Sequence, residues 1–241
     1  MKIHFTPPAV CLTLLLGAGL VLVTVAAYGQ ETPPGRSGPG KAGWKPLFDG
    51  KTTNGWQAFR KPAGTPLGWV VEDGTLTTPG GQGDILTADR YENFELDLEW
   101  KIAPKGNSGI MFRVVDDGQY QRTYETGPEY QLIDDEGYPA ALKDVQKTAA
   151  NYDLQAVSKS ATKPAGQWNR TRLVVKDGRV QHWLNGTKVV EYEIGSEAWQ
   201  KQVQGSKFAK LPGYAQTPRG HIALQDHGDR VWFRNVRIRE L

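Results

Sequence analysis

Short apolar runs separated by turn-forming residue pairs dominate the sequence from residue 44 onward. Asp-Gly or Asn-Gly pairs divide these runs at residues 49–50, 73–74, 177–178 and 185–186. Both residues of such a pair tolerate the positive φ that a tight β-hairpin requires. The run Phe94–Ile102 alternates apolar and charged side chains, which is typical of a strand with one buried and one solvated face. We therefore predict an all-β domain, built as a two-sheet antiparallel β-sandwich of the jelly-roll type.

The other runs are assigned in chain order. Residues 108–115 are expected to form the partner strand of Phe94–Ile102. Residues 140–151 could form a helical turn or two but are read as a long loop, and residues 196–213 as an irregular excursion with one short helix. Further strands are expected at residues 171–175, 180–184, 188–192, 221–227 and 231–238.

The composition limits the classes of function. The 241 residues are 39% hydrophobic and 23% charged, as in an ordinary soluble domain. The formal net charge is only +3, and the basic residues are scattered among acidic ones. Domains that bind nucleic acid instead concentrate lysine and arginine in a patch or stripe. We therefore expect no nucleic-acid partner.

The first 43 residues are set apart from the folded domain. Lys2 precedes an uncharged apolar stretch at residues 10–27, and small residues follow it, so residues 1–29 are predicted to be a secretory signal peptide. An uncleaved N-terminal membrane anchor is the alternative. Residues 30–43 are rich in proline and glycine and are predicted to be a disordered linker to a domain at 44–241. The expected location is periplasmic or secreted, with no membrane attachment after cleavage.

A polar stretch at residues 124–135, read as a single strand, is the first candidate for a functional surface. Because side chains alternate along a strand, Glu129, Gln131 and Ile133 are expected to share one face. Glu125 precedes this group and Asp134 follows it, so several acidic side chains could meet one ligand. An ordinary solvated strand face is the alternative.

The strand expected at residues 221–227 is the second candidate. His221, Gln225 and His227 would share one face, so both imidazoles are expected to face a cleft. For His221, a hydrogen-bonded structural role is the alternative. Arg113, in the strand at residues 108–115, is either a substrate contact or the ion-pair partner of an acid on the next strand.

Five segments of the sequence resemble the 3-keto-disaccharide hydrolase domain family. They lie at residues 47–56 (LFDGKTTNGW), 107–114 (NSGIMFRV), 129–135 (EYQLIDD), 168–192 (WNRTRLVVKDGRVQHWLNGTKVVEY) and 222–241 (IALQDHGDRVWFRNVRIREL). The resemblance implies the jelly roll of the concanavalin A-like lectins and glucanases. One segment departs from the family pattern, because Ala149 follows Lys147 and Thr148 where members often carry glycine. The shape of that loop, which leads to Tyr152, is therefore open.

The resemblance implies activity on glycosides that are oxidised at C3 of the sugar. The ketone acidifies the C2 proton, so a base can remove it, the C1 substituent leaves by β-elimination, and water adds to the resulting enone. Glu129 and His227 are the candidate base and acid. Arg113, or a divalent metal ion held by Glu129 and His227, would stabilise the enolate oxygen. An oxidoreductase that forms the ketone is the expected functional partner.

Other polar and aromatic side chains are expected to contact the carbohydrate. Trp199 and Tyr214, in the excursion at residues 196–213, are expected to stack on a sugar ring. The candidate polar contacts are Arg113, Glu125, Gln131, Asp134, Tyr152, His221 and Gln225.

Two other functions fit the same residues. The spacing of Glu129 and Asp134 resembles the paired carboxylates of jelly-roll glucanases, although Gln131 stands where such a motif carries an ionisable group. The second alternative is a carbohydrate-binding module without catalysis, because one fold serves lectins and enzymes alike.

Overall fold

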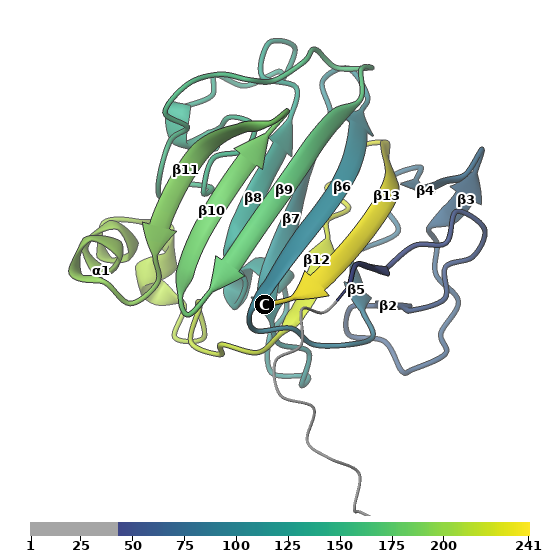
Figure 1. Ribbon diagram of the computed structural model, residues 1–241, viewed down its shortest axis with the longest axis horizontal. Coiled ribbons are helices and arrows are strands. Elements are labelled where there is room, and N and C mark those ends of the chain that lie inside the picture. The colour runs from purple at the N-terminus through teal and green to yellow at the C-terminus, as the bar shows by residue number, and fades with distance from the viewer. Residues whose placement is uncertain (1–42) are drawn as a thin grey trace, which may run out of the picture. The chain divides into compact units, whose positions relative to one another are not determined.

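Residues 43–241 are described by the computed structural model, and they form two stacked antiparallel β-sheets (Figure 1). The predicted all-β two-sheet sandwich is confirmed, with 38% of residues 43–241 in strands and 9% in helices. The predicted signal peptide, and the linker apart from its last residue, lie outside the described residues. None of the helices in residues 43–241 is long and apolar enough to cross a membrane.

The larger sheet has the strand order β11-β10-β9-β6-β13-β4-β3, with β1 beside β13. Its broad face is turned toward the viewer in Figure 1. The central strand β6 spans Phe94–Ile102, as its alternating pattern predicted. The other strands are β1 (Lys45–Pro46), β3 (Val70–Glu72), β4 (Thr75–Thr78), β9 (Asn169–Lys176), β10 (Arg179–Leu184), β11 (Thr187–Glu193) and β13 (Val231–Glu240).

The smaller sheet lies behind the larger one in Figure 1 and has the order β2-β5-β12-β7-β8. Its strands are β2 (Trp56–Ala58), β5 (Ile85–Thr87), β7 (Asn107–Val114), β8 (Glu129–Ile133) and β12 (His221–Leu224). Apolar side chains that alternate along β7 and β8, such as Phe112 and Tyr130, point into the main core. Their neighbours along the same strands therefore face outward, away from the larger sheet.

The excursion after β11 contains one short α-helix, as predicted. The helix α1 spans Glu197–Gln204, and the Ser196 hydroxyl accepts a hydrogen bond of 3.2 Å from the Trp199 amide at its first turn. Serine at this position satisfies an amide that has no partner within the helix. Single 3-10 turns occur at Thr123–Glu125, Asp144–Gln146 and Lys207–Lys210.

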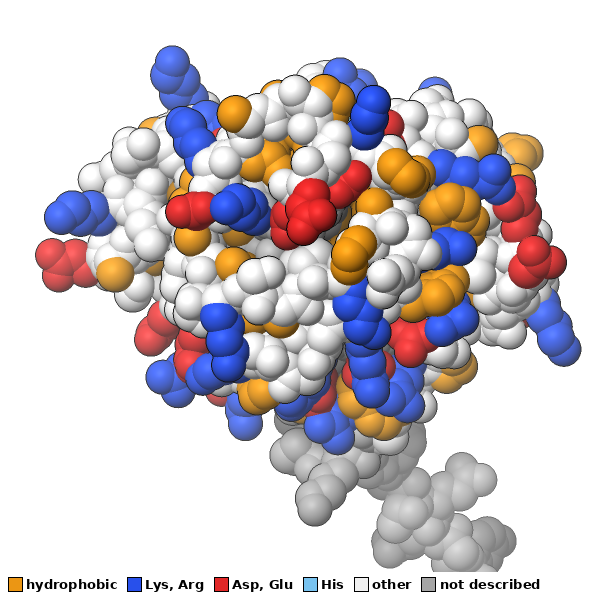
Figure 2. Space-filling view, turned by 90° about the horizontal axis from the view of Figure 1, so that it is seen from above, with side chains coloured by type: hydrophobic (Ala, Val, Ile, Leu, Met, Phe, Trp, Pro, Cys, Tyr) orange, Lys and Arg blue, Asp and Glu red, His pale blue; other side chains and the backbone are white. Residues whose placement is uncertain are grey.

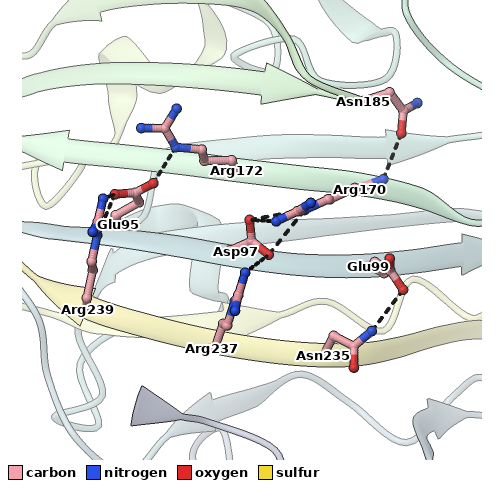
Figure 3. A network of polar contacts seen from close by, with 9 residues as sticks. All are labelled: Glu95, Asp97, Glu99, Arg170, Arg172, Asn185, Asn235, Arg237 and Arg239. Carbon is pink, nitrogen blue, oxygen red and sulfur yellow. Dashed lines mark hydrogen bonds and ion pairs between the residues drawn. The ribbon is translucent and has the colours of Figure 1, made fainter. Parts of the chain in front are cut away.

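Three acidic side chains of β6 lie on the outer face of the larger sheet (Figure 3). Glu95 binds arginines of β9 and β13, Arg172 and Arg239. Asp97 binds Arg170 of β9 at 2.8 Å. The sequence pattern predicted a solvated face, yet Glu95 is only 4% exposed because the arginine side chains cover it.

The surface carries charges of both signs. The face seen from above in Figure 2 has lysine and arginine side chains with aspartate and glutamate side chains between them. This mixture agrees with a formal net charge of only +3.

Three expectations about strands were wrong. The partners of β6 are β9 and β13, whereas β7 lies in the other sheet and pairs with β8 and β12. The stretch at residues 124–135 is not one strand, because the 3-10 turn at Thr123–Glu125 precedes the shorter β8. The strand expected at residues 221–227 ends at Leu224, so Gln225 and His227 lie in the following loop.

A neutral histidine is built into the core of the sandwich. His182 is 0% exposed, its Nδ1 lies 2.8 Å from the Ala149 carbonyl oxygen, and its ring packs against Tyr130 and Tyr192. Burial lowers the pKa of His182 to about 4. Below its ordinary pKa of 6.5, the unfolded chain takes up a proton that the folded chain excludes, so stability is lost as the pH falls toward 4.

We expect His182→Gln to reduce this acid sensitivity, because glutamine can donate to the same carbonyl and does not titrate. The free energy of unfolding, measured by urea denaturation, should fall by roughly 1–3 kcal/mol more in the wild type than in the variant over this pH window. Parallel curves for the two proteins would show that His182 does not carry the effect.

Candidate functional site

A small polar cavity of about 90 Å³ lies on the outer side of the smaller sheet. Glu129 and Gln131 reach it because they alternate with Tyr130 and Leu132, which point into the main core. Eight residues line this cavity: Asn107, Tyr124, Glu129, Gln131, Tyr152, Lys207, Gln225 and His227. The structure thus brings together five of the residues singled out in the sequence, namely Glu129, Gln131, Tyr152, Gln225 and His227.

Glu129 lies deep in the cavity with 6% of its surface exposed. Its carboxyl lies directly against Gly109 of β7, and a Cβ atom on that glycine would be 2.2 Å from Glu129 Oε1. Burial raises the pKa of Glu129 to about 8, and the positive charge of Lys207 partly opposes that rise. Because the pKa is close to neutral, this carboxyl can both accept and return a proton near neutral pH.

Gln131 connects Glu129 to the neighbouring strand. With its amide oriented to satisfy its surroundings, the Gln131 nitrogen donates to the Ser108 carbonyl and to Glu129 Oε1, both at 3.0 Å. One oxygen of the Glu129 carboxyl is therefore held in place, and the other has no hydrogen-bond partner among the described residues.

Lys207 brings a positive charge to the cavity from the 3-10 turn after α1. Its Nζ lies 4.3 Å from the centre of the Tyr152 ring and 5.8 Å from that of Tyr124. An ion pair of 3.2 Å joins it to Asp153. Two aromatic rings and a carboxylate therefore position the ammonium group beside Glu129.

Lys207, Tyr124 and Asn107 line the cavity but were not predicted from the sequence to do so. Lys207 carried no signal of its own, because it lies in a polar segment far along the chain from Glu129. Tyr124 and Asn107 each stood within segments that the analysis had noted, next to Glu125 and at the start of β7.

The loop after β12 delivers Gln225 and His227 to the cavity. The Gln225 amide donates to the Gly109 carbonyl at 2.9 Å, and its own carbonyl accepts from the Ser108 hydroxyl at 2.8 Å. The side-chain oxygen of Gln225 has no hydrogen-bond partner among the described residues. Because this oxygen is also buried, it is an exception to the usual pairing of buried polar atoms.

Four other candidates do not line the cavity. Asp134 accepts hydrogen bonds from the backbone amides of Lys105, Glu136 and Gly137 and borders a different hollow. Glu125 accepts from the Gln121 amide. Arg113 is buried and donates to the Ala215 carbonyl at 3.2 Å.

His221 is the fourth of these residues. Its Nδ1 lies 2.7 Å from the Thr87 carbonyl oxygen, and its Nε2 accepts from Arg90 at 3.0 Å. The expected common face with His227 is broken because β12 ends at Leu224, before Gln225 and His227. The pairing with β7 also shifts between His221 and Ala223, but the extra residue lies on β7 and the alternation along β12 is kept.

Trp199 and Tyr214 lie within a buried series of rings rather than at this cavity. Trp199 is 5% and Tyr214 3% exposed, and their parallel rings have centroids 6.0 Å apart. Tyr214 also stacks on Phe208 at 4.2 Å. Because Phe208 follows Lys207 directly, the stack supports the turn that carries the lysine. Tyr124 and Tyr152 are the aromatic side chains at the cavity itself.

The loop left open in the sequence analysis runs along the outer edge of β8. The Gln131 amide donates to the Ala150 carbonyl, and the Tyr152 amide to the Glu129 carbonyl at 3.1 Å. Ala149 adopts a φ of +67°, a conformation that favours glycine. Ala149 thus adopts the backbone conformation that a glycine at this position would favour. The loop holds Tyr152 beside Glu129.

The residues at the cavity give limited support for a metal ion. Within residues 43–241, no three histidine, cysteine, aspartate or glutamate side chains are grouped so that they could hold one. Glu129 and His227 both line the cavity, but an ion there would need ligands beyond these two side chains.

Comparisons with known proteins show the family of the chain and agree with its fold. The family model for the 3-keto-alpha-glucoside-1,2-lyase-like domain matches residues 43–239. A curated relative from Bacteroides thetaiotaomicron, named 3-keto-disaccharide hydrolase, is 35% identical over 229 residues, or 83% of this chain and 79% of the relative.

Solved structures show the same architecture. A crystal structure of a protein from Parabacteroides distasonis, assigned as a glycosyl hydrolase, is 40% identical with a TM-score of 0.78, and the match covers 83% of this chain and 94% of that one. A second such structure from the same organism is 31% identical with a TM-score of 0.61, covering 83% and 100%. A Bacillus subtilis protein with a galectin-like fold, 13% identical with a TM-score of 0.52, shares the fold alone.

Proposed function

The chain belongs to the 3-keto-alpha-glucoside-1,2-lyase-like domain family, and from this premise we propose that it cleaves 3-keto-glycosides by removing the C2 proton. One observation carries the proposal. Among the described residues, Glu129 is the one carboxylate that lines the cavity, and its pKa is raised to about 8. A single base of this strength suits a proton acidified by a neighbouring ketone. The name of the Bacteroides relative supports the same substrate class.

The proposed reaction begins with proton transfer from C2 to Glu129. The electron pair of the C2–H bond moves toward the ketone, and negative charge develops on O3, where the Lys207 ammonium would stabilise it. The charge then returns to form a C1–C2 double bond as the C1–O bond breaks. His227 would donate a proton to the departing oxygen.

Hydration completes the hydrolysis. Water adds to C1 of the enone and gives one proton to His227, which restores the imidazole that protonated the leaving oxygen, and the proton held by Glu129 returns to C2, which gives the free 3-keto sugar. If the enone leaves the site before water adds, the same residues act as a lyase. No step in this sequence requires the second carboxylate of a glucanase. Because Asp134 borders another hollow, the paired-carboxylate alternative has the weaker support.

A direct test compares a 3-keto-glucoside with its unoxidised parent. We expect proton NMR to show release of the aglycone from the keto compound alone. Cleavage of the parent would instead favour the glucanase alternative. Broadening of the sugar signals without turnover of either compound would favour a carbohydrate-binding module. Repeating the assay with a chelator would reveal whether a metal ion takes part.

Gly109 provides a test of how closely the base must be placed. We expect Gly109→Ala to displace the Glu129 carboxyl, because the added Cβ would lie 2.2 Å from Oε1 and 2.9 Å from Cδ. A displacement of this kind should lower kcat by about 10–100-fold. Gly43→Ala is the matched control, since a Cβ there meets no atom within 4 Å. Equal activity in both variants would show that the carboxyl does not need this position.

Export and an upstream partner are part of the same proposal. The charge at Lys2 and the apolar stretch at residues 10–27 support secretion. The mass of the mature N-terminus, measured on protein recovered from the periplasm or medium, tests this. Because the substrate carries a ketone at C3, an oxidoreductase that oxidises a glycoside at that carbon would have to supply it.

A further inference from the structure

Asp84 lies at the start of β5, outside the set of residues that line the cavity. One oxygen of its carboxylate accepts a hydrogen bond of 2.9 Å from the Asp226 backbone amide. The other accepts a short hydrogen bond from the Thr123 hydroxyl. These donors lie on two loops that are far apart in the sequence, so the carboxylate joins both loops to the same strand.

Each of the two donors immediately precedes a side chain of the cavity. Thr123 comes before Tyr124, whose ring faces the Lys207 ammonium, and Asp226 comes before His227. The loop with His227 has no strand partners of its own, because β12 ends at Leu224. Its position therefore depends on hydrogen bonds such as the one to Asp84.

The side chain of Asp226 makes further hydrogen bonds that hold the loop with His227. Its carboxylate accepts from the Thr78 hydroxyl at 2.8 Å and from the backbone amides of Gly81 and Gly228, both at 2.9 Å. The loop that carries His227 is thus tied to the segment before β5 as well as to Asp84.

We propose that Asp84 is a positioning residue, which fixes the Tyr124 and His227 segments relative to Glu129. The proposal rests on the proposed function for its effect on catalysis, but its structural part can be measured without turnover. Asp84 also acts through its charge. Its carboxylate and that of Asp153 raise the pKa of Glu129, whereas Lys207 lowers it.

Two substitutions separate the hydrogen bonds from the charge. In Asp84→Asn, the amide oxygen can still accept from the Asp226 amide, and the amide nitrogen can donate to the Thr123 hydroxyl. That variant keeps the linkage and removes the charge. Asp84→Ala removes both, and Thr123→Val removes only the hydrogen bond to the Tyr124 segment.

The experiment measures kcat, KM and the pH dependence of kcat/KM for these variants of the full chain with a 3-keto-glucoside. We expect Asp84→Ala to lower kcat by about 10-fold or more, with a smaller change in KM. Asp84→Asn should lose less activity, and the rising limb of its profile should move to lower pH, because Glu129 loses a neighbouring negative charge. Asp49→Asn is the matched control, since Asp49 caps a turn through the amides of Lys51 and Thr52 and is not a cavity residue.

The Hε1 NMR signal of His227, assigned with His227→Gln, gives a readout that needs no reaction. Asp84→Ala should shift or broaden this signal, and Asp84→Asn should leave it close to the wild-type position. A wild-type signal and wild-type kcat in Asp84→Ala would overturn the proposal. An inactive wild type would instead overturn the proposed function, while the signal would still test the positioning. If Asp84→Ala does not fold, an unchanged kcat in Thr123→Val contradicts the proposal and a lowered one supports it.

Discussion

Glu129→Gln is expected to lower kcat for a 3-keto-glucoside by about 10²–10⁴-fold, because glutamine has the same shape and no basic oxygen. KM should change much less, since the amide still occupies the place of the carboxyl between Gly109 and Gln131. Steady-state kinetics on the purified protein check this. Glu125→Gln is the matched control, because Glu125 does not line the cavity and binds only the Gln121 amide among the described residues.

The same substitution should make the protein more stable at alkaline pH. The pKa of Glu129 is raised from 4.5 to about 8 in the folded chain, so ionisation favours the unfolded chain as the pH rises between these values. Glutamine has no such ionisation. The melting temperature of Glu129→Gln, relative to wild type, should therefore increase with pH and level off above about 8. A gain that does not depend on pH would contradict the raised pKa, and full turnover would contradict the assignment of the base.

Lys207→Met is expected to lower kcat/KM by about 10²–10³-fold, because it removes the one lysine or arginine of residues 43–241 that lines the cavity and that is proposed to stabilise the enolate oxygen. The rising limb of the pH profile should also move to higher pH, since the charge of Lys207 lowers the pKa of Glu129. The measurement is kcat/KM against pH for the variant and the wild type.

Two further variants define what Lys207 contributes. Lys210→Met removes an exposed lysine from the same 3-10 turn and should leave activity unchanged. Lys207→Arg keeps the charge and should restore part of the loss, together with the position of the pH limb. An unshifted limb in Lys207→Met would show that the lysine does not act on Glu129.

Several of the longer strands and the hairpins that join β9, β10 and β11 could be predicted from the sequence, but the partners of β6 could not. The alternation in Phe94–Ile102 determined both the strand and its inner face, since Leu96, Leu98 and Trp100 are all buried. The same pattern gives no information about which strand lies beside β6. Which strands pair with each other depends on the packing of the whole sandwich. In this protein β7 lies in the smaller sheet.

Burial on both faces of β7 is a second reason why the position of the site could not be predicted from the sequence. Met111 and Val114 point away from the main core, yet both are completely buried. A glycine beyond β7, Gly127, lies against Met111 and Val114, so the connecting segment covers this side of the sheet. Burial on both faces of a strand leaves no polar alternation in the sequence that could reveal the side on which a site lies.

The candidate site was predicted where it depends on local order and missed where it depends on distant segments. Glu129 and Gln131 share a face because they are two residues apart on one strand. Lys207 lies near them because the stacked rings of Trp199, Tyr214 and Phe208 support the turn that carries it. This stack forms only in the folded chain. His221 and His227 do not share a face because β12 ends at Leu224, which the residues of that stretch do not reveal.

The fate of the hydrogen at C2 of the sugar tests the central claim most directly. The measurement is mass spectrometry and proton NMR of the product formed from a 3-keto-glucoside in D₂O, corrected for exchange in the free product incubated under the same conditions. Removal of the C2 hydrogen by Glu129 predicts that a substrate deuterated at C2 reacts more slowly, and that any exchange of the proton held by Glu129 with D₂O places deuterium at C2 of the product. An unchanged rate with the deuterated substrate, together with complete retention of the original hydrogen at C2, would contradict the account and require direct displacement at C1.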